Sequence, residues 1–243
     1  MSIRLRALLL VVCMLLTPFA FVSAEATYTW AEGEITYPEG EDWIYRYTYR
    51  YPVLSGDAPA AHAVNAWFDV AFSEMNDLIL PMFASEADMA GGGANEIDHL
   101  YAVTCNSDDF FSILLTQTQD MGESPMMSLT GQVFAMSGEY TGETLTLRGL
   151  LRVGDSSQQI AEAIVRDVWT KVKDLPGALE RWEDPDHFMD DFDPETQFYA
   201  DEKENAVFFL QPGVLDEMEP MTFAYSAQAA EALLKQQEKE IAP

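Results

Sequence analysis

The fold of the C-terminal half is decided by residues 198–212, which read FYADEKENAVFFLQP. This stretch contains an aromatic run from Phe198, a charged turn centred on Lys203 to Asn205, and a second aromatic run that ends at Pro212. Two apolar runs joined by a short polar turn are typical of a β-hairpin. Residues 221–225 follow as a third short strand, so we expect a small antiparallel sheet in this half.

The rest of the chain alternates between strand-like and helix-like patterns. Large residues at every second position from Trp43 to Val53 predict a half-buried strand. Apolar residues at helical spacing predict an amphipathic helix over residues 57–79, with Asp57 as its cap and Pro59 in its first turn. Further strands are expected at residues 100–104, 110–117 and 128–136, a loop at 85–98, and helices at 157–173 and from Ser226 onward.

These elements predict an α+β fold in which antiparallel sheets pack against amphipathic helices. We expect two halves of similar size, residues 25–127 and residues 128–243. The sequence leaves open whether they form one compact unit or two independent domains.

The N-terminus has the features of a secretory signal. Arg4 and Arg6 precede an apolar run from Ala7 to Val22, and small residues lead to Ala24, where a signal peptidase would cleave. We therefore expect residues 1–24 to be removed and the mature chain, without a membrane span, to act outside the cytoplasm. An uncleaved membrane anchor is the alternative.

The chain is strongly acidic, with 13 basic and 41 acidic side chains and a formal net charge of −28. Removal of residues 1–24 would take away two arginines and no acid, which leaves 11 basic residues and a charge of −30. Such a surface repels nucleic acid and attracts cationic proteins and divalent metals, although acidity can also serve solubility alone. Cys105 is the one cysteine after residue 24, so an intramolecular disulfide is excluded and a buried thiol is expected.

The C-terminal half resembles the RsiV-type C-terminal domain, a bacterial extracytoplasmic family whose known member is an anti-sigma factor that senses lysozyme. The resemblance rests on the hairpin of residues 198–212, the third strand at 221–225 and the turn T-G-x-x-L-x-L at residues 141–147. Residues 25–127, with Pro52 before a helix that contains Asn65, are similar to the N-terminal accessory domain of the deacetylase PdaC. Most relatives have no assigned activity, so the resemblance implies fold and compartment.

The resemblance implies a binding or sensing module at the cell envelope, and we expect no enzymatic activity. The surface that the family would use contains Phe208, Pro212, Gly213, Val214 and Leu215. The expected ligand is a cationic protein such as lysozyme, or a cell-wall component. A cationic protein would suit the acidic chain because opposite charges speed encounter. After Pro212 the chain departs from the family, since residues 216–219 read DEME where an aromatic recognition loop is expected.

An acidic segment suggests an alternative function, a calcium-assisted hydrolase that acts on envelope polysaccharide. Calcium needs several carboxylate oxygens around one point. With Asp191 as the first ligand, Asp193, Glu195 and Glu202 fall at the third, fifth and twelfth positions of an EF-hand-like loop. Thr196 stands where such a loop needs glycine, and the loop would overlap the hairpin. A solvated acidic segment is therefore the other interpretation, and no cofactor is expected.

Overall fold

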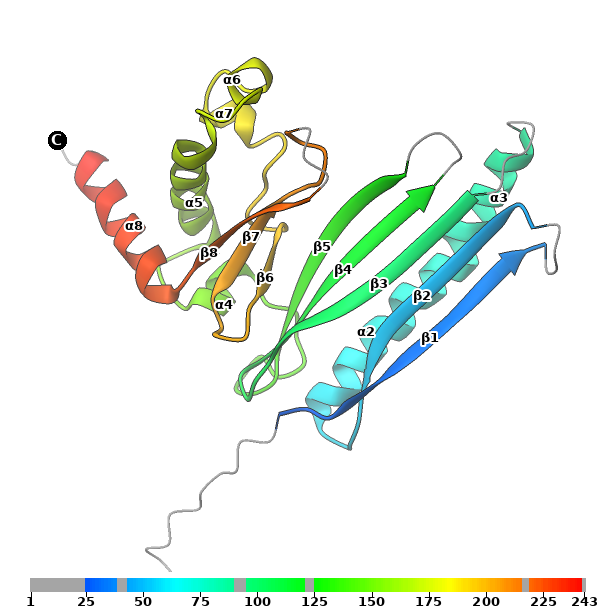
Figure 1. Cartoon of the computed structure of the whole chain (residues 1–243). Helices are drawn as coiled ribbons and strands as arrows, with labels where there is room; N and C mark the ends of the chain where they lie inside the picture. Colours follow the sequence, from blue (N-terminus) through cyan, green and yellow to red (C-terminus); the bar gives the residue numbers. More distant parts are fainter. Residues whose placement is uncertain (1–24, 39–42, 90–94, 121–124, 216–218, 242–243) are drawn as a thin grey trace, which may run out of the picture.

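The computed structural model describes residues 25–38, 43–89, 95–120, 125–215 and 219–241, which form two sheets with helices packed against them (Figure 1). This arrangement confirms the predicted α+β class. The first sheet consists of β1 (Tyr28–Tyr37), β2 (Tyr45–Leu54), β3 (Asn95–Asn106), β4 (Phe110–Asp120) and β5 (Met126–Ala135), in that order. The second sheet consists of β6 (Phe198–Ala200), β7 (Ala206–Leu210) and β8 (Met221–Tyr225).

A long helical run covers one face of the first sheet (Figure 1). It consists of α2 (Pro59–Glu74), the π-helical segment η1 (Met75–Ile79) and α3 (Leu80–Met89). The run connects β2 to β3, which pair in parallel, and a parallel pair needs such a crossover. Tyr45 and Tyr47 of β2 pack against Met75 and Leu80 of the run, so the alternation seen in the sequence places the aromatic face of β2 on the helix.

Two expectations for this half need correction, and one strand was not predicted. The helical run extends to Met89 and β3 begins at Asn95, so the predicted loop at residues 85–98 is much shorter, and its three glycines lie outside the described residues. Asp57 does not cap α2, because Ala58 occupies the cap position and forms no side-chain hydrogen bond there. The edge strand β1 pairs with β2 along its whole length and was not predicted.

The C-terminal half follows its sequence closely. β6 and β7 form the predicted hairpin, and β8 adds the third antiparallel strand. Helix α5 (Ser157–Val172) is capped by Ser156, whose hydroxyl accepts a hydrogen bond from the Gln159 amide. Helix α8 (Ala227–Ile241) packs beside α5 (Figure 1). The remaining helices are short: α4 (Leu147–Leu151), α6 (Ala178–Arg181) and α7 (Pro185–Phe188).

The two sheets pack against each other where β6 lies over β4 and β5. At Gly131 of β5 an added Cβ would lie 1.9 Å from the carbonyl oxygen of Phe198, so only glycine permits this approach. The core of the C-terminal half also contains Cys105, Phe110 and Val133 from the first sheet, so the halves share one core. β5 spans the predicted boundary between residues 127 and 128.

Cys105 is buried, as expected. Among the helices in the described ranges, none is both long enough and apolar enough to cross a lipid bilayer.

Candidate functional site

An open cleft of about 800 Å³ lies where the first sheet meets the segment that leads to α4. Three parts of the chain line it: the turn between β3 and β4, the loop between β5 and α4, and α4 with the residues that follow. The charged lining residues are Asp109, Glu139, Glu143, Arg148 and Arg152. The hydroxyl and aromatic lining residues are Ser137, Thr144, Thr146, Tyr140 and Phe110. The lining therefore combines charged and polar groups with aromatic surface.

The loop between β5 and α4 has a fixed base and an exposed tip. The Ala135 amide donates to the carbonyl of Glu143 at 3.0 Å, and the Gly142 amide donates to the carbonyl of Ala135 at 2.7 Å. Gly142 has φ +86°, and an added Cβ would lie 2.6 Å from the Cβ of Ala63 on α2, so glycine is required here. Tyr140 lies near the tip with 57 % of its surface exposed, which presents an aromatic ring to solvent.

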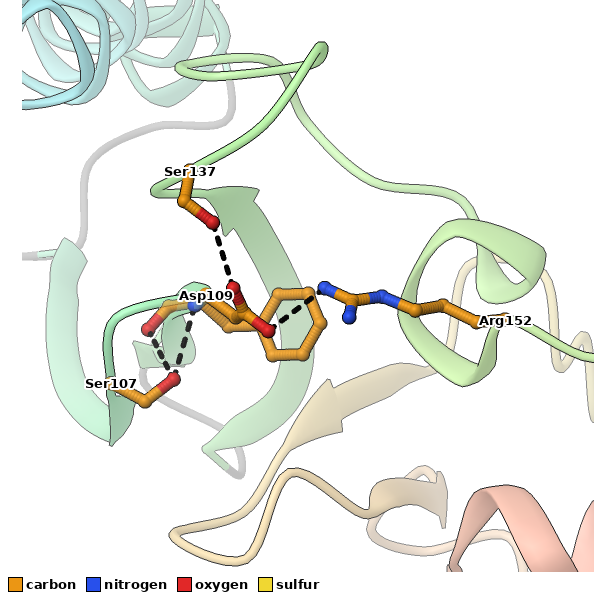
Figure 2. Close-up of polar contacts among 5 residues, drawn as sticks. Ser107, Asp109, Ser137 and Arg152 are labelled. Carbon is orange, nitrogen blue, oxygen red and sulfur yellow. Dashed lines mark hydrogen bonds and ion pairs between the residues drawn. The ribbon is translucent and has the colours of Figure 1, made fainter.

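Asp109 is the centre of the polar contacts in the cleft. In Figure 2, Ser137 and Arg152 each contact a different oxygen of its carboxylate. The Ser137 hydroxyl donates to Oδ1 at 2.7 Å, and an Arg152 guanidinium N–H donates to Oδ2 at 3.1 Å. The hydrogen bond from Ser137 and the contact with Arg152 both lower the pKa of Asp109. Asp109 is therefore ionised at neutral pH.

Arg152 occupies an unusual backbone position. It ends α4 with φ 55° and ψ 32°, in the left-handed region that favours glycine. Its guanidinium lies 5.0 Å from the centre of the Phe110 ring, and 61 % of its side-chain surface is exposed. The cation therefore lies at the mouth of the cleft between an aromatic ring and a carboxylate.

Arg148 is the second cation of the cleft. Its Nε–H donates a long hydrogen bond of 3.4 Å to the carbonyl of Gly154, and its backbone amide donates to the Ser157 hydroxyl at 3.2 Å. Within the described ranges, Arg148 forms no ion pair with a carboxylate. Two guanidinium groups therefore line one cleft of a strongly acidic chain, and Arg148 has no carboxylate counterion among the residues that the structure describes.

The binding residues expected from the sequence lie elsewhere. Phe208 is completely buried in the C-terminal core and cannot contact a ligand at the surface, which corrects that expectation. Pro212, Gly213, Val214 and Leu215 form a surface turn after β7. The hollow beside this turn has a volume of about 10 Å³, enough for one water molecule at most. A ligand at this turn stays a prediction.

The acidic residues of the calcium hypothesis have different partners within the protein. Asp191 accepts hydrogen bonds from Arg181 Nε at 2.6 Å and from the Trp182 indole at 2.8 Å. Asp193 accepts from the Glu195 amide and the Thr196 hydroxyl, which shapes the turn before β6, whereas Glu202 is exposed in the hairpin turn. No group of three or more acidic, histidine or cysteine side chains within the described ranges is arranged to hold a metal ion.

Asp109, Arg148 and Arg152 were not predicted as site residues from the sequence. Residues 141–147 were interpreted only as a junction between the halves, although residues 143–146 of this motif line the cleft. The positions of the few basic residues could have indicated this site. After residue 24 the chain has 11 basic residues, and two of them, four positions apart, lie directly after this motif.

Comparison with known proteins supports the fold and leaves the site unassigned. No family model matches the chain, and no curated protein matches it. The chain is similar to the crystal structure of a member of the DUF3298 family from Bacteroides fragilis, with a TM-score of 0.50 and 13 % sequence identity over 84 % of this chain and 92 % of that chain. A fold that covers both halves is thus shared with a domain of unknown function, and the finer RsiV-type and PdaC-type resemblances stay predictions.

Proposed function

We propose that the chain is a non-enzymatic binding module that acts outside the cytoplasm, at the bacterial cell envelope, and holds its ligand in the cleft beside Asp109 and Arg152. The observation that carries this proposal is the open cleft of about 800 Å³ at the junction of the halves. Its volume is that of a site for a small molecule or a short segment of a polymer.

The protonation state of Asp109 favours binding over proton transfer. A general acid or base is most effective when its pKa lies near the working pH. The contacts from Ser137 and Arg152 lower the pKa of Asp109 and keep the carboxylate ionised and hydrogen-bonded. Such a group orients neighbouring side chains and accepts hydrogen bonds, which suits the recognition of a polar ligand such as a cell-wall component.

The binding proposal can be tested with soluble fragments of purified cell wall. A ligand that binds only the native state raises the melting temperature with its concentration. We expect such a rise for the wild type and its loss in Tyr140→Ala, because Tyr140 is exposed in the cleft wall and its replacement leaves the core intact. Leu179→Ala is the matched control, since Leu179 is also exposed and lies outside the cleft lining. An equal rise in both variants, or turnover of the fragments, would contradict the proposal.

A cationic protein such as lysozyme is a second candidate ligand, favoured by the formal net charge of −28. Attraction between opposite charges is screened by salt within about 10 Å at 0.1 M. We therefore expect calorimetric titration with lysozyme to give heat at low salt and progressively less as salt is added. The absence of heat at low salt would eliminate this ligand and leave the cleft proposal standing.

A further inference from the structure

We propose that the cleft recognises its ligand through a free carboxylate, which Arg152 and Arg148 hold, while Tyr140 covers the neutral part of the ligand. This inference rests on the cleft being the binding site, and it adds the chemical class of the ligand. The carboxylate belongs either to an acidic sugar or to the C-terminus of a short peptide, because both present the same planar anion to a guanidinium.

The two arginines have hydrogen-bond donors left over for a ligand. A guanidinium has five N–H donors in a planar fork. In the described part of the chain, the Arg152 side chain forms one hydrogen bond, to Asp109, and the Arg148 side chain forms one, to the carbonyl of Gly154. Most of their donors are therefore free for a ligand, and a carboxylate matches the fork with two parallel hydrogen bonds.

The surroundings of Arg152 hold its guanidinium ready for such a ligand. Asp109 fixes one N–H of the group at 3.1 Å, and the ring of Phe110 lies 5.0 Å from its central carbon. Asp109 is itself held by the Ser137 hydroxyl at 2.7 Å and by its own carbonyl, which accepts from the Met136 amide at 2.8 Å. A cation that is already oriented loses less conformational entropy on binding than a free surface arginine.

The backbone of Arg152 supports a role for its side chain. A residue with a Cβ in the left-handed region is disfavoured relative to glycine by about 1 kcal/mol. Glycine would end α4 at this position without strain, since φ is 55°. The chain instead has an arginine whose side chain is 61 % exposed and that does not fill the core. Strain of this kind often marks a functional position.

The charge balance of the cleft disfavours a ligand that carries more than one negative charge. Asp109, Glu139 and Glu143 line the same cleft as the two arginines, so the protein supplies three carboxylates and two cations. A phosphate with nearly two negative charges would be repelled more strongly by these carboxylates than a carboxylate with one. The exposed ring of Tyr140 offers an apolar face on which a sugar ring or an apolar side chain can pack.

The inference is tested by comparing acids with their neutral amides. Glucuronic acid and glucuronamide form one pair, and alanylalanine and its C-terminal amide form the other. Each compound is titrated into the 15N-labelled chain at low salt, and the arginine Nε–H and backbone signals are followed by NMR. We expect an acid to bind at least about tenfold more tightly than its amide. The pair that shows the larger preference identifies the source of the carboxylate.

Three variants locate the carboxylate. Arg152→Gly removes the side chain at a φ that suits glycine, so the variant is expected to fold, and it should weaken binding of the acid at least about tenfold. Arg148→Gln should also weaken binding of the acid. Arg166→Gln removes the same charge from the exposed face of α5, outside the cleft lining, and should leave the affinity within about twofold of the wild type.

The outcomes separate this inference from the proposed function. If amides bind as tightly as acids and Tyr140→Ala abolishes both, the cleft binds ligands without recognising a carboxylate, and only the present inference fails. If Arg152→Gly retains the wild-type affinity for an acid, the inference fails as well. If neither acid perturbs the cleft signals, the carboxylate assignment is wrong, while the melting experiment with cell-wall fragments still decides the proposed function.

Discussion

Side-chain amides at three positions take the place of a peptide group in the backbone hydrogen-bonding pattern. Each of them accepts from the N–H and donates to the C=O of one distant residue. The pairs are Asn65 with Leu54, Asn106 with Ala26, and Gln211 with Leu129. A carboxamide has the same donor and acceptor as a peptide bond, so it can satisfy both backbone groups where no strand is available. These side chains fix the end of β2, the segment before β1 and the junction of the halves.

We predict that Asn65→Ala lowers the free energy of unfolding by about 1 to 3 kcal/mol, because it leaves the N–H and C=O of Leu54 without their partner. Asn65→Asp should also destabilise the protein, since a carboxylate cannot donate to the carbonyl at 2.9 Å. Urea denaturation measures both changes. Asn76→Ala is the control, because within the described residues the Asn76 side chain forms a single hydrogen bond, to the carbonyl of Phe72. A loss as large as that of Asn65→Ala would argue against the importance of the paired hydrogen bonds to Leu54.

At the scale of elements, the acidic segment around α6 and α7 owes its shape to Asp191. Arg181 donates to both of its carboxylate oxygens, at 2.6 and 3.0 Å, and the buried Trp182 donates from its indole. The hydrogen bonds from Arg181 and then from Trp182 lower the pKa of Asp191. Asp191 therefore anchors α6 to the segment after α7.

The lowered pKa of Asp191 makes its contribution to stability dependent on pH. The carboxylate stabilises the fold fully above the pKa of an unfolded aspartate, about 4, and this stabilisation is lost as the pH falls through the lower folded value. We predict that Asp191→Asn is less stable than the wild type at neutral pH, by about 1 to 3 kcal/mol. Urea denaturation as a function of pH should show the difference shrinking below pH about 4. A difference that stays constant with pH would count against this role.

The close contact between β5 and β6 requires glycine at position 131. In Gly131→Ala the new Cβ would meet the carbonyl oxygen of Phe198 at 1.9 Å and the Cβ of Tyr199 at 3.2 Å. The two strands must therefore move apart, and we expect a loss of about 1 to 3 kcal/mol in the free energy of unfolding. Thr130→Ala on the same strand, at an exposed position, should change it by less than about 0.5 kcal/mol. Equal losses in the two variants would show that the close approach is unimportant.

The elements that were predicted correctly carry strong local signals, and those that were missed do not. The hairpin of residues 198–212 and helix α5 are specified by aromatic runs and by the cap at Ser156. In β1, Glu32, Gly33 and Glu34 interrupt the apolar pattern, and its pairing with β2 becomes visible only in three dimensions. The cleft was missed for the same reason, because Asp109 and Arg152 are 43 positions apart and meet only in the folded chain.

At the scale of the whole molecule, the cleft depends on the two halves being one body. Its walls come from the turn after β3 on one side and from α4 on the other. Independent motion of the halves would therefore pull the two walls apart. The shared core prevents this. Phe110 lines the cleft and also belongs to the same buried cluster as Leu147 and Leu150 of α4 and Val133 of β5. The residue that supports Arg152 is thus part of the core that joins the halves.

A shared core predicts that both halves unfold in one cooperative step, because neither can keep Cys105, Phe110 and Val133 buried when the other is lost. Cys105 can report on this core because it is buried. Burial raises the pKa of its thiol and so suppresses the thiolate, which is the form that reacts with a labelling reagent. In a chain with Cys13→Ser, thiol labelling should follow the same urea transition as tryptophan fluorescence and far-ultraviolet circular dichroism. Introducing a cysteine at the exposed Ser128 provides a control that labels without urea. Labelling of Cys105 well before the fluorescence transition would mean that the halves separate first, and a cleft built from both of them would then be an unstable binding site.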